Sequence, residues 1–77
     1  MNHIYRPERL VRFRKEAGLS QMDAVRATGI NQGVLSRYET GNAIPTLAAA
    51  VALSDLYGVP YGEFVDGIYP VFDAEVA

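Results

Sequence analysis

Apolar residues recur along the chain with helical spacing, in segments separated by glycines. In the first segment Leu10, Phe13 and Ala17 follow one another at intervals of three and four, which places them on one face of a helix. Pro7 suits the first turn of this helix, because its missing N–H has no partner there in any case. Gly18 follows the last apolar position and predicts the end of the helix.

Two short helices are predicted next, and each begins at a polar capping residue. Ser20 is a good N-cap for the second helix, which Gly29 ends. Asn31 caps the third helix, and Gly41 ends it. The apolar positions of the third helix point inward, so its outer face carries four small or polar residues: Gln32, Gly33, Ser36 and Arg37.

The remaining pattern predicts two more helices. Thr46 caps a fourth helix with Leu53 and Tyr57 on its inner stripe, and a short fifth helix at about residues 61–65 brings Phe64 to the core. No segment shows the alternation typical of a strand. The sequence therefore predicts an all-α domain of five helices.

The expected organisation has three parts. Residues 1–6 lack periodicity and should form a flexible N-terminal arm, and residues 7–67 should form the folded domain. Residues 68–77 form a C-terminal tail that begins with the apolar run Ile68 to Phe72. Two hypotheses stay open for this run: a contact between subunits, or packing onto the helices of its own domain.

Composition narrows the class of protein. Seventy-seven residues, half of them apolar, suit one small globular domain that buries about 60% of its unfolded surface. There is no cysteine, and His3 has no second metal ligand near it, so we expect neither a disulfide nor a metal site. The longest apolar run, residues 47–53, is too short to span a membrane, and no signal region is evident. A cytoplasmic location is expected.

Charge divides the chain into two halves. Residues 1–37 hold all seven cations and three acids, which gives +4, whereas residues 38–77 hold six acids and no cation, which gives −6. This asymmetry suggests one surface that faces phosphates and another that faces away from them. A chance distribution of solvated charge is the alternative.

Taken in their order along the chain, these motifs resemble the Cro- and phage-repressor-like helix-turn-helix family, also called Xre-like, over residues 8–66. The resemblance implies a five-helix domain that binds operator DNA, usually as a dimer, with the helix-turn-helix at the second and third helices. It rests on Arg14, Gly18-Leu19-Ser20-Gln21, Gly29, Asn31-Gln32, Leu35-Ser36-Arg37-Tyr38-Glu39, Gly41, Pro45 and Gly58-Val59.

The resemblance places the outer face of the third helix in the major groove. Gln32 can pair with adenine N6 and N7, and Arg37 can pair with guanine or grip a phosphate. Ser36 can contact bases with little specificity. Gly33 has no side chain where relatives often read a base, although it leaves room for a thymine methyl, so we expect modest specificity.

Phosphate contacts are expected near the start of the second helix and around the third. Gln21 stands where free N–H groups favour an anion, and in the family a Gln here also braces the recognition helix. Arg26 either attracts phosphate or is merely solvated. The weaker phosphate candidates are Ser20, Asn31, Thr40 and Asn42. The family often joins the positions of Arg14 and Glu39 in a salt bridge, which we expect here as a structural tie.

The sequence therefore predicts a DNA-binding transcriptional regulator, most simply a small Cro-like or immunity repressor that acts as a dimer on double-stranded DNA. It contains no catalytic set of Ser, His and Asp and no phosphate-binding glycine loop, so we expect neither an enzyme nor a cofactor. The alternative is a helix-turn-helix module used for protein contact, such as an antitoxin or anti-repressor. The acidic second half and apolar tail favour that alternative.

Overall fold

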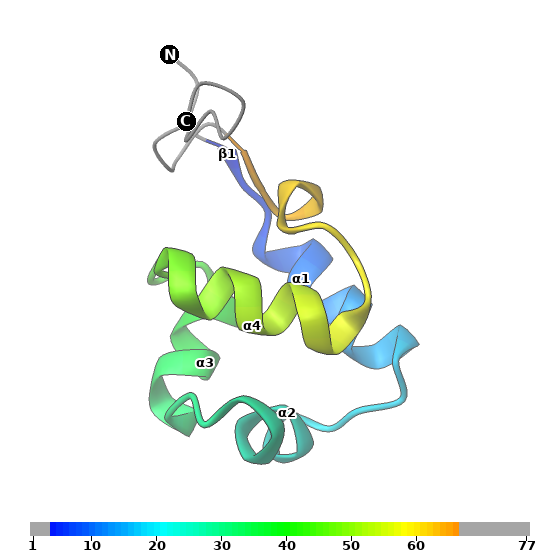
Figure 1. Cartoon of the computed structure of the whole chain (residues 1–77). Coiled ribbons are helices and arrows are strands. Elements are labelled where there is room, and N and C mark those ends of the chain that lie inside the picture. The colour runs from blue at the N-terminus through cyan, green and yellow to red at the C-terminus, as the bar shows by residue number, and fades with distance from the viewer. Residues whose placement is uncertain (1–3, 67–77) are drawn as a thin grey trace, which may run out of the picture.

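The computed structural model describes residues 4–66, in which helices pack around a common centre and a short ribbon projects from one end (Figure 1). β1 lies beside β2 in the ribbon, away from α2 in this view. The elements in chain order are β1 (Ile4–Tyr5), α1 (Pro7–Glu16), α2 (Gln21–Thr28), α3 (Gln32–Thr40), α4 (Leu47–Tyr57), the 3-10 helix η1 (Tyr61–Glu63) and β2 (Val65–Asp66).

Capping side chains begin α2, α3 and α4 at the predicted residues. Ser20 Oγ accepts from the N–H of Asp23 at 3.0 Å, and the Asp23 carboxylate accepts from the N–H of Ser20 at 2.9 Å. These two bonds form a reciprocal capping box at the start of α2. Asn31 caps α3 through its side-chain oxygen, and Thr46 caps α4 by accepting from the N–H of Ala49 at 3.1 Å.

Gly41 ends α3 and also lets α1 approach it. Its φ of 83° lies in the left-handed region, which side chains with a Cβ rarely adopt. A Cβ added at this position would lie 3.2 Å from Cγ of Pro7, the first residue of α1. Two separate constraints therefore favour glycine at position 41: the left-handed backbone of the turn and the close packing against Pro7.

One apolar core fills the space between the helices. α1 packs against α3, and α2 packs against both α3 and α4. Burying one Leu or Phe side chain contributes roughly 1.5–3 kcal/mol, so these few residues supply much of the driving force for folding. The side chains with no exposed surface come from all four α-helices and from the residue that follows η1: Leu10, Ala24, Leu35, Ala50, Leu53 and Phe64.

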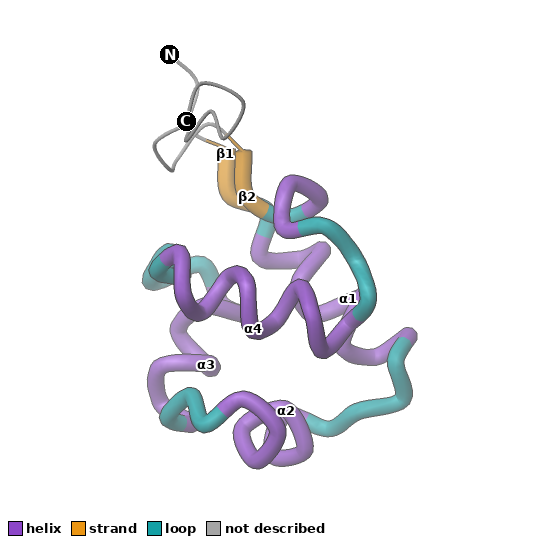
Figure 2. Tube along the Cα trace, viewed as in Figure 1, coloured by secondary structure: helices purple, strands orange, loops and turns teal. Residues whose placement is uncertain are grey.

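β1 and β2 form an antiparallel ribbon that the sequence did not predict (Figure 2). Ile4 pairs with Asp66 and Tyr5 pairs with Val65, so these residues of the expected flexible arm belong to the fold. Two residues are too few to show strand alternation, and their partner lies at the other end of the described chain. The Tyr5 hydroxyl also donates to the carbonyl of Tyr38, which joins the ribbon to the last turns of α3.

The predicted fifth helix is a single 3-10 turn. η1 covers Tyr61–Glu63, and the following N–H of Phe64 donates to the Tyr61 carbonyl at 3.0 Å. Phe64 lies in the core as expected, but Val65 joins β2 instead of a helix. The described fold is thus mostly helical, with four α-helices, and not purely α. The tail at 68–77 lies outside the described residues.

Candidate nucleic-acid interface

An ion pair between Arg14 of α1 and Glu39 of α3 holds the two helices together. Arg14 Nε donates to Glu39 Oε2 at 2.7 Å, and Nη2 donates to Oε1 at 3.2 Å. The third guanidinium nitrogen donates to the carbonyl of Leu19 at 2.9 Å, in the turn before α2. The two side chains are only 12% and 7% exposed. The pair expected from the sequence therefore joins α1, α3 and the start of α2.

Gln21, the first residue of α2, adds a third donor to the same carboxylate. Its Nε2 donates to Glu39 Oε1 at 3.2 Å, so α2 and α3 are also braced directly. This is the bracing contact that the family resemblance implied. Gln21 as a whole is partly buried at the start of α2.

Tyr57 of α4 lies near this ion pair without bonding to it. Its hydroxyl is buried and has no hydrogen-bond partner among the described residues. Burial raises the pKa of Tyr57 to about 12, and the nearby Glu39 carboxylate adds to the increase, while Arg14 opposes it. The hydrogen bond to the Glu39 carboxylate in turn raises the pKa of Arg14, which keeps the guanidinium charged.

The first turn of α3 presents an exposed polar surface. Asn31 Oδ1 accepts from the N–H of Gly33 at 2.8 Å and from that of Val34 at 3.3 Å, so the Asn31 amide nitrogen is left for other partners. Gln32, Gly33 and Arg37 are exposed. Neither Gln32 nor Arg37 makes a side-chain hydrogen bond or ion pair within residues 4–66. These expected base-contact positions therefore share one open surface, with Ser36 partly buried beside them.

The residues expected to contact phosphate differ in whether their side chains still have a free hydrogen-bond donor. Ser20 Oγ accepts a bond in the capping box, which leaves its hydrogen free. The Thr40 hydroxyl already donates to the carbonyls of Ser36 and Arg37, at 3.1 and 3.2 Å, so it would have to give up these bonds to donate to a phosphate. Asn42 is exposed in the loop after α3.

Arg26 has a partner that the sequence analysis missed. Its Nη1 lies 3.6 Å from an Asp23 carboxylate oxygen, one turn earlier on α2. Both side chains are largely exposed, and such pairs contribute at most about 1 kcal/mol. The i, i+3 spacing of the two residues was the available signal. A phosphate could displace Asp23 at little cost.

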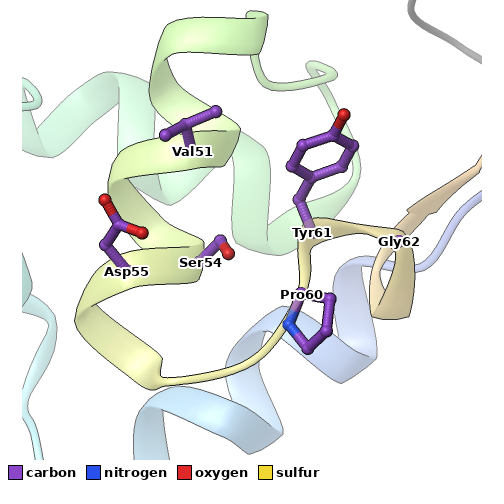
Figure 3. A pocket seen from close by; sticks show the side chains of 6 residues that line it. All are labelled: Val51, Ser54, Asp55, Pro60, Tyr61 and Gly62. Atoms are coloured by element: carbon purple, nitrogen blue, oxygen red, sulfur yellow. The ribbon is translucent and has the colours of Figure 1, made fainter. Parts of the chain in front are cut away.

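A second surface, over α4 and η1, is apolar. An open groove of about 440 Å³ lies there, with Val51 on the helix facing the η1 side of the groove in Figure 3. Leu47 and Val51, one turn apart on α4, are 36% and 41% exposed. Residues 38–66 hold no cation. The groove is lined by Val51, Ser54, Asp55, Pro60, Tyr61 and Gly62.

Two other kinds of site receive no support from the described part of the chain. Within residues 4–66, no group of three or more His, Cys, Asp or Glu side chains could hold a metal ion. No helix in this range is both long and apolar enough to cross a membrane.

Comparisons with known proteins bear on the family and the fold of the chain. Residues 8–64 match the family model described as a helix-turn-helix domain. Among solved structures, a complex of the SinR and SinI proteins has a chain with a TM-score of 0.73 and 22% identity, covering 91% of this chain and 69% of that one. A transcriptional regulator from Listeria innocua gives a TM-score of 0.70 and 20% identity, covering 99% and 70%. These two structures are similar in fold. No curated protein matches the chain.

Proposed function

Because this chain belongs to the helix-turn-helix domain family, we propose that it is a transcriptional regulator that places α3 in the major groove of DNA. The observation that carries the proposal is the open surface at the start of α3. Gln32 and Arg37 are exposed there and have no side-chain hydrogen bond or ion pair to another of residues 4–66, and they lie next to the exposed Gly33. The Gln32 amide has a donor and an acceptor, and the Arg37 guanidinium has several donors, which are the groups that read base edges in the major groove.

The contacts around α3 support a fixed orientation on DNA. Glu39 is bonded to both Arg14 and Gln21, so side-chain hydrogen bonds tie α1 and α2 to α3. Gln21, the Ser20 hydroxyl and the Asn31 amide nitrogen lie near two helix starts, where free N–H groups favour phosphate. Asn42 and Arg26 extend these proposed phosphate contacts to either side.

The proposed mode of action is repression by a homodimer in the cytoplasm. A dimer with two-fold symmetry places its recognition helices about 34 Å apart, one turn of DNA, and prefers near-palindromic sites. A small domain that occupies such a site blocks transcription without a further activity. The region 68–77 is the proposed subunit contact, with packing onto its own domain as the alternative.

The test separates base readout from attraction to phosphate. Gln32→Ala should cost roughly 1–3 kcal/mol of binding and relax the preference at one base pair, because the lost contact depends on sequence. Arg26→Ala should weaken binding equally on all sequences and flatten the salt slope by about one unit. Footprinting on the DNA that flanks the gene supplies the site. Unchanged binding of both variants to specific and random DNA would refute the assignment of α3.

A second candidate function is protein contact through the apolar face of α4. Leu47, Val51 and Tyr61 expose apolar surface there, and Arg9, a cation beside η1, is paired with Glu63. One of the proteins similar in fold, SinR, was solved in complex with a second protein, SinI. A stoichiometric protein partner together with the lack of salt-sensitive DNA binding would favour this function over the first.

A further inference from the structure

Most of the large apolar side chains that the described chain leaves exposed lie on α4, on η1 or in the loop before α4. Leu47 and Val51 are one turn apart on α4, Tyr61 begins η1, and Ile44 lies in the loop, whereas Met22 lies elsewhere, on α2. Single exposed apolar residues are normal on a protein surface, but a group of them marks a surface that another molecule covers. This surface is therefore a candidate interface.

The groove between α4 and η1 has two apolar walls. Figure 3 shows Val51 of α4 on one side and the ring of Tyr61 on the other, with Pro60 beside η1. The Ser54 hydroxyl donates to the Val59 carbonyl, so its hydrogen is already used inside the fold. With about 440 Å³ of open space, the groove falls within the roughly 300–1,000 Å³ typical of binding sites and can take apolar side chains of a partner.

Asp55 places a negative charge at the rim of this groove. It follows Val51 by one turn of α4 and is exposed, on the side of the helix away from Tyr61 in Figure 3. Within residues 4–66 Asp55 forms no ion pair and no side-chain hydrogen bond. The cation that reaches η1, Arg9, is held by Glu63, whose backbone carbonyl accepts from Arg9 Nη1 at 3.1 Å and whose carboxylate lies 3.8 Å away. The groove thus presents an apolar surface beside an uncompensated negative charge.

The charge of Asp55 distinguishes between the possible occupants of the groove. A DNA phosphate would be repelled. The apolar run at 68–72 is followed by Asp73 and Glu75, and residues 67–77 hold no cation, so the tail of this chain or of a second copy would bring acids toward Asp55. A segment of another protein that carries a cation beside an apolar side chain complements both features of the groove.

We propose that the groove between α4 and η1 binds a segment of another protein in which an apolar side chain and a Lys or Arg lie about one helical turn apart. The inference rests on the second candidate function, protein contact through α4, and names the chemistry of its partner. The apolar side chain fills the space between Val51 and Tyr61, where its burial supplies most of the affinity. The cation lies against Asp55, where an exposed pair adds more to specificity than to affinity. One turn of α4, about 5.4 Å, separates the two contacts and sets the spacing in the partner.

The experiment selects peptides from a random peptide display library with the full chain and its variants. The parent should enrich peptides that carry Lys or Arg within about four residues of an aliphatic or aromatic residue. Asp55→Lys reverses the charge at the rim, so it should enrich Asp or Glu at that place instead and bind the parent's peptides on the order of tenfold more weakly. Val51→Ser removes one apolar wall and should also weaken these peptides on the order of tenfold.

The matched control is Glu16→Lys, which makes the same change in net charge at an exposed position at the end of α1. It should enrich the same peptides as the parent and bind them with the same affinity. Melting curves establish that each variant is folded. If Asp55→Lys is not, Asp55→Asn takes its place and should lose the preference for Lys and Arg. Val51→Ser should bind DNA as the parent does, which separates this surface from α3.

The outcomes separate this inference from the function on which it rests. Peptides that depend on Val51 but show no preference for Lys or Arg would overturn the inference and leave protein contact through α4 standing. Enrichment of the same peptides by Asp55→Lys has the same meaning. If no enriched peptide depends on Val51, the second candidate function fails together with the inference, whereas DNA binding by α3 is unaffected.

Two further results would assign the groove to a different occupant and so refute the inference. Tighter binding of the selected peptides to Phe72→Ser than to the parent would show that the chain's own tail covers the groove. A dimer that Val51→Ser dissociates in analytical ultracentrifugation would show that a second copy covers it. We expect neither substitution to have these effects.

Discussion

The Glu39 carboxylate accepts three side-chain hydrogen bonds, two from Arg14 and one from Gln21. Because both members of the ion pair are largely buried, removing one leaves the other charge without compensation. Such a loss typically costs about 3–5 kcal/mol, as much as a domain of this size has in total. We expect Glu39→Ala to be largely unfolded at moderate temperature, as measured by circular dichroism.

The chain offers an exposed pair as the control for Glu39→Ala. Arg9 and Glu63 lie 3.8 Å apart, with side chains 37% and 53% exposed. Exposed pairs contribute at most about 1 kcal/mol, so Glu63→Ala should melt within a few degrees of the parent. A melting temperature of Glu39→Ala that matches that of Glu63→Ala would show that the buried pair has no structural role.

Two tyrosines should respond in opposite ways to loss of their hydroxyl groups. Tyr5 donates to the Tyr38 carbonyl, so Tyr5→Phe should cost about 0.5–1.5 kcal/mol of stability. The buried Tyr57 hydroxyl has no described partner, so Tyr57→Phe should leave stability unchanged or increase it. Urea denaturation measures both. A loss of stability in Tyr57→Phe as large as in Tyr5→Phe would show that its hydroxyl is hydrogen-bonded.

The raised pKa of Tyr57 makes a further prediction at alkaline pH. The pKa is about 12 in the folded chain against an ordinary value of 10, so between these values the unfolded chain loses the proton first. Ionisation of this group therefore stabilises the unfolded state, and stability falls as pH rises from about 10 toward 12. Tyr57→Phe should lose less stability than the parent over this range. Parallel curves for the two proteins would contradict the assignment.

The helices themselves were largely predictable because their signals are local. Ser20, Asn31 and Thr46 cap helices in the structure as they do in the sequence analysis, since a cap involves residues only two or three positions apart. The ribbon was not predictable in this way. Tyr5 and its partner Val65 lie far apart in the sequence, near the two limits of the described residues, so no local pattern indicates that they pair.

The capping box of α2 can be tested as a single element. Ser20→Ala removes the oxygen that accepts from Asp23 N–H, which should cost about 0.5–2 kcal/mol. The reciprocal bond from the Ser20 backbone lowers the pKa of Asp23, so its contribution is present above pH 4 and disappears as pH falls through the lower, folded-state value. Thermal melting at pH 7 and at pH 2 checks both. Ser20→Ala keeps this backbone N–H, so Asp23→Asn tests the reciprocal bond: an equal difference from the parent at the two pH values would contradict the role of the carboxylate.

The sequence predicted which residues make up the candidate site, but it did not predict how their side chains lie relative to one another. The residue types at Gln32 and Arg37 indicate what each side chain can bond, and the helical spacing places them on one face. The position of a long side chain depends on its neighbours, however, and the approach of Arg37 to Gly33 is visible only in three dimensions. The pairing of Arg26 with Asp23 was missed for a simpler reason, since it follows from their spacing.

The whole molecule should bind DNA with a shallow dependence on salt. Its second half carries no cation, and Arg26 and Arg37 are the cations on α2 and α3, the two helices of the proposed interface. At about 0.9 per phosphate neutralised, two cations per subunit give a slope of about −2, or about −4 for a dimer. Affinity measured between 50 and 200 mM salt checks this value.

A matched substitution shows whether the slope reflects contacts or net charge. Asp55 is exposed on α4, away from the first turn of α3, so Asp55→Asn should leave the slope unchanged although it changes the net charge by one. A slope of about −8 or steeper in the parent would place additional phosphate contacts on α1 or on its N-cap residue Arg6, where the remaining described cations lie.

The ribbon of β1 and β2 has a consequence for the order in which the domain assembles. Ile4 and Asp66 lie at opposite ends of the described chain, so their pairing closes the largest loop among the described residues. The entropic cost of closing this loop is smaller once the helices have packed, so we expect the pairing to form after them. The ribbon should accordingly form late in folding and open first in the native state. Each opening would release the Tyr5 hydroxyl from the last turns of α3. Hydrogen exchange should therefore be fast in the ribbon and at the end of α3 together, and slow in the core of α1.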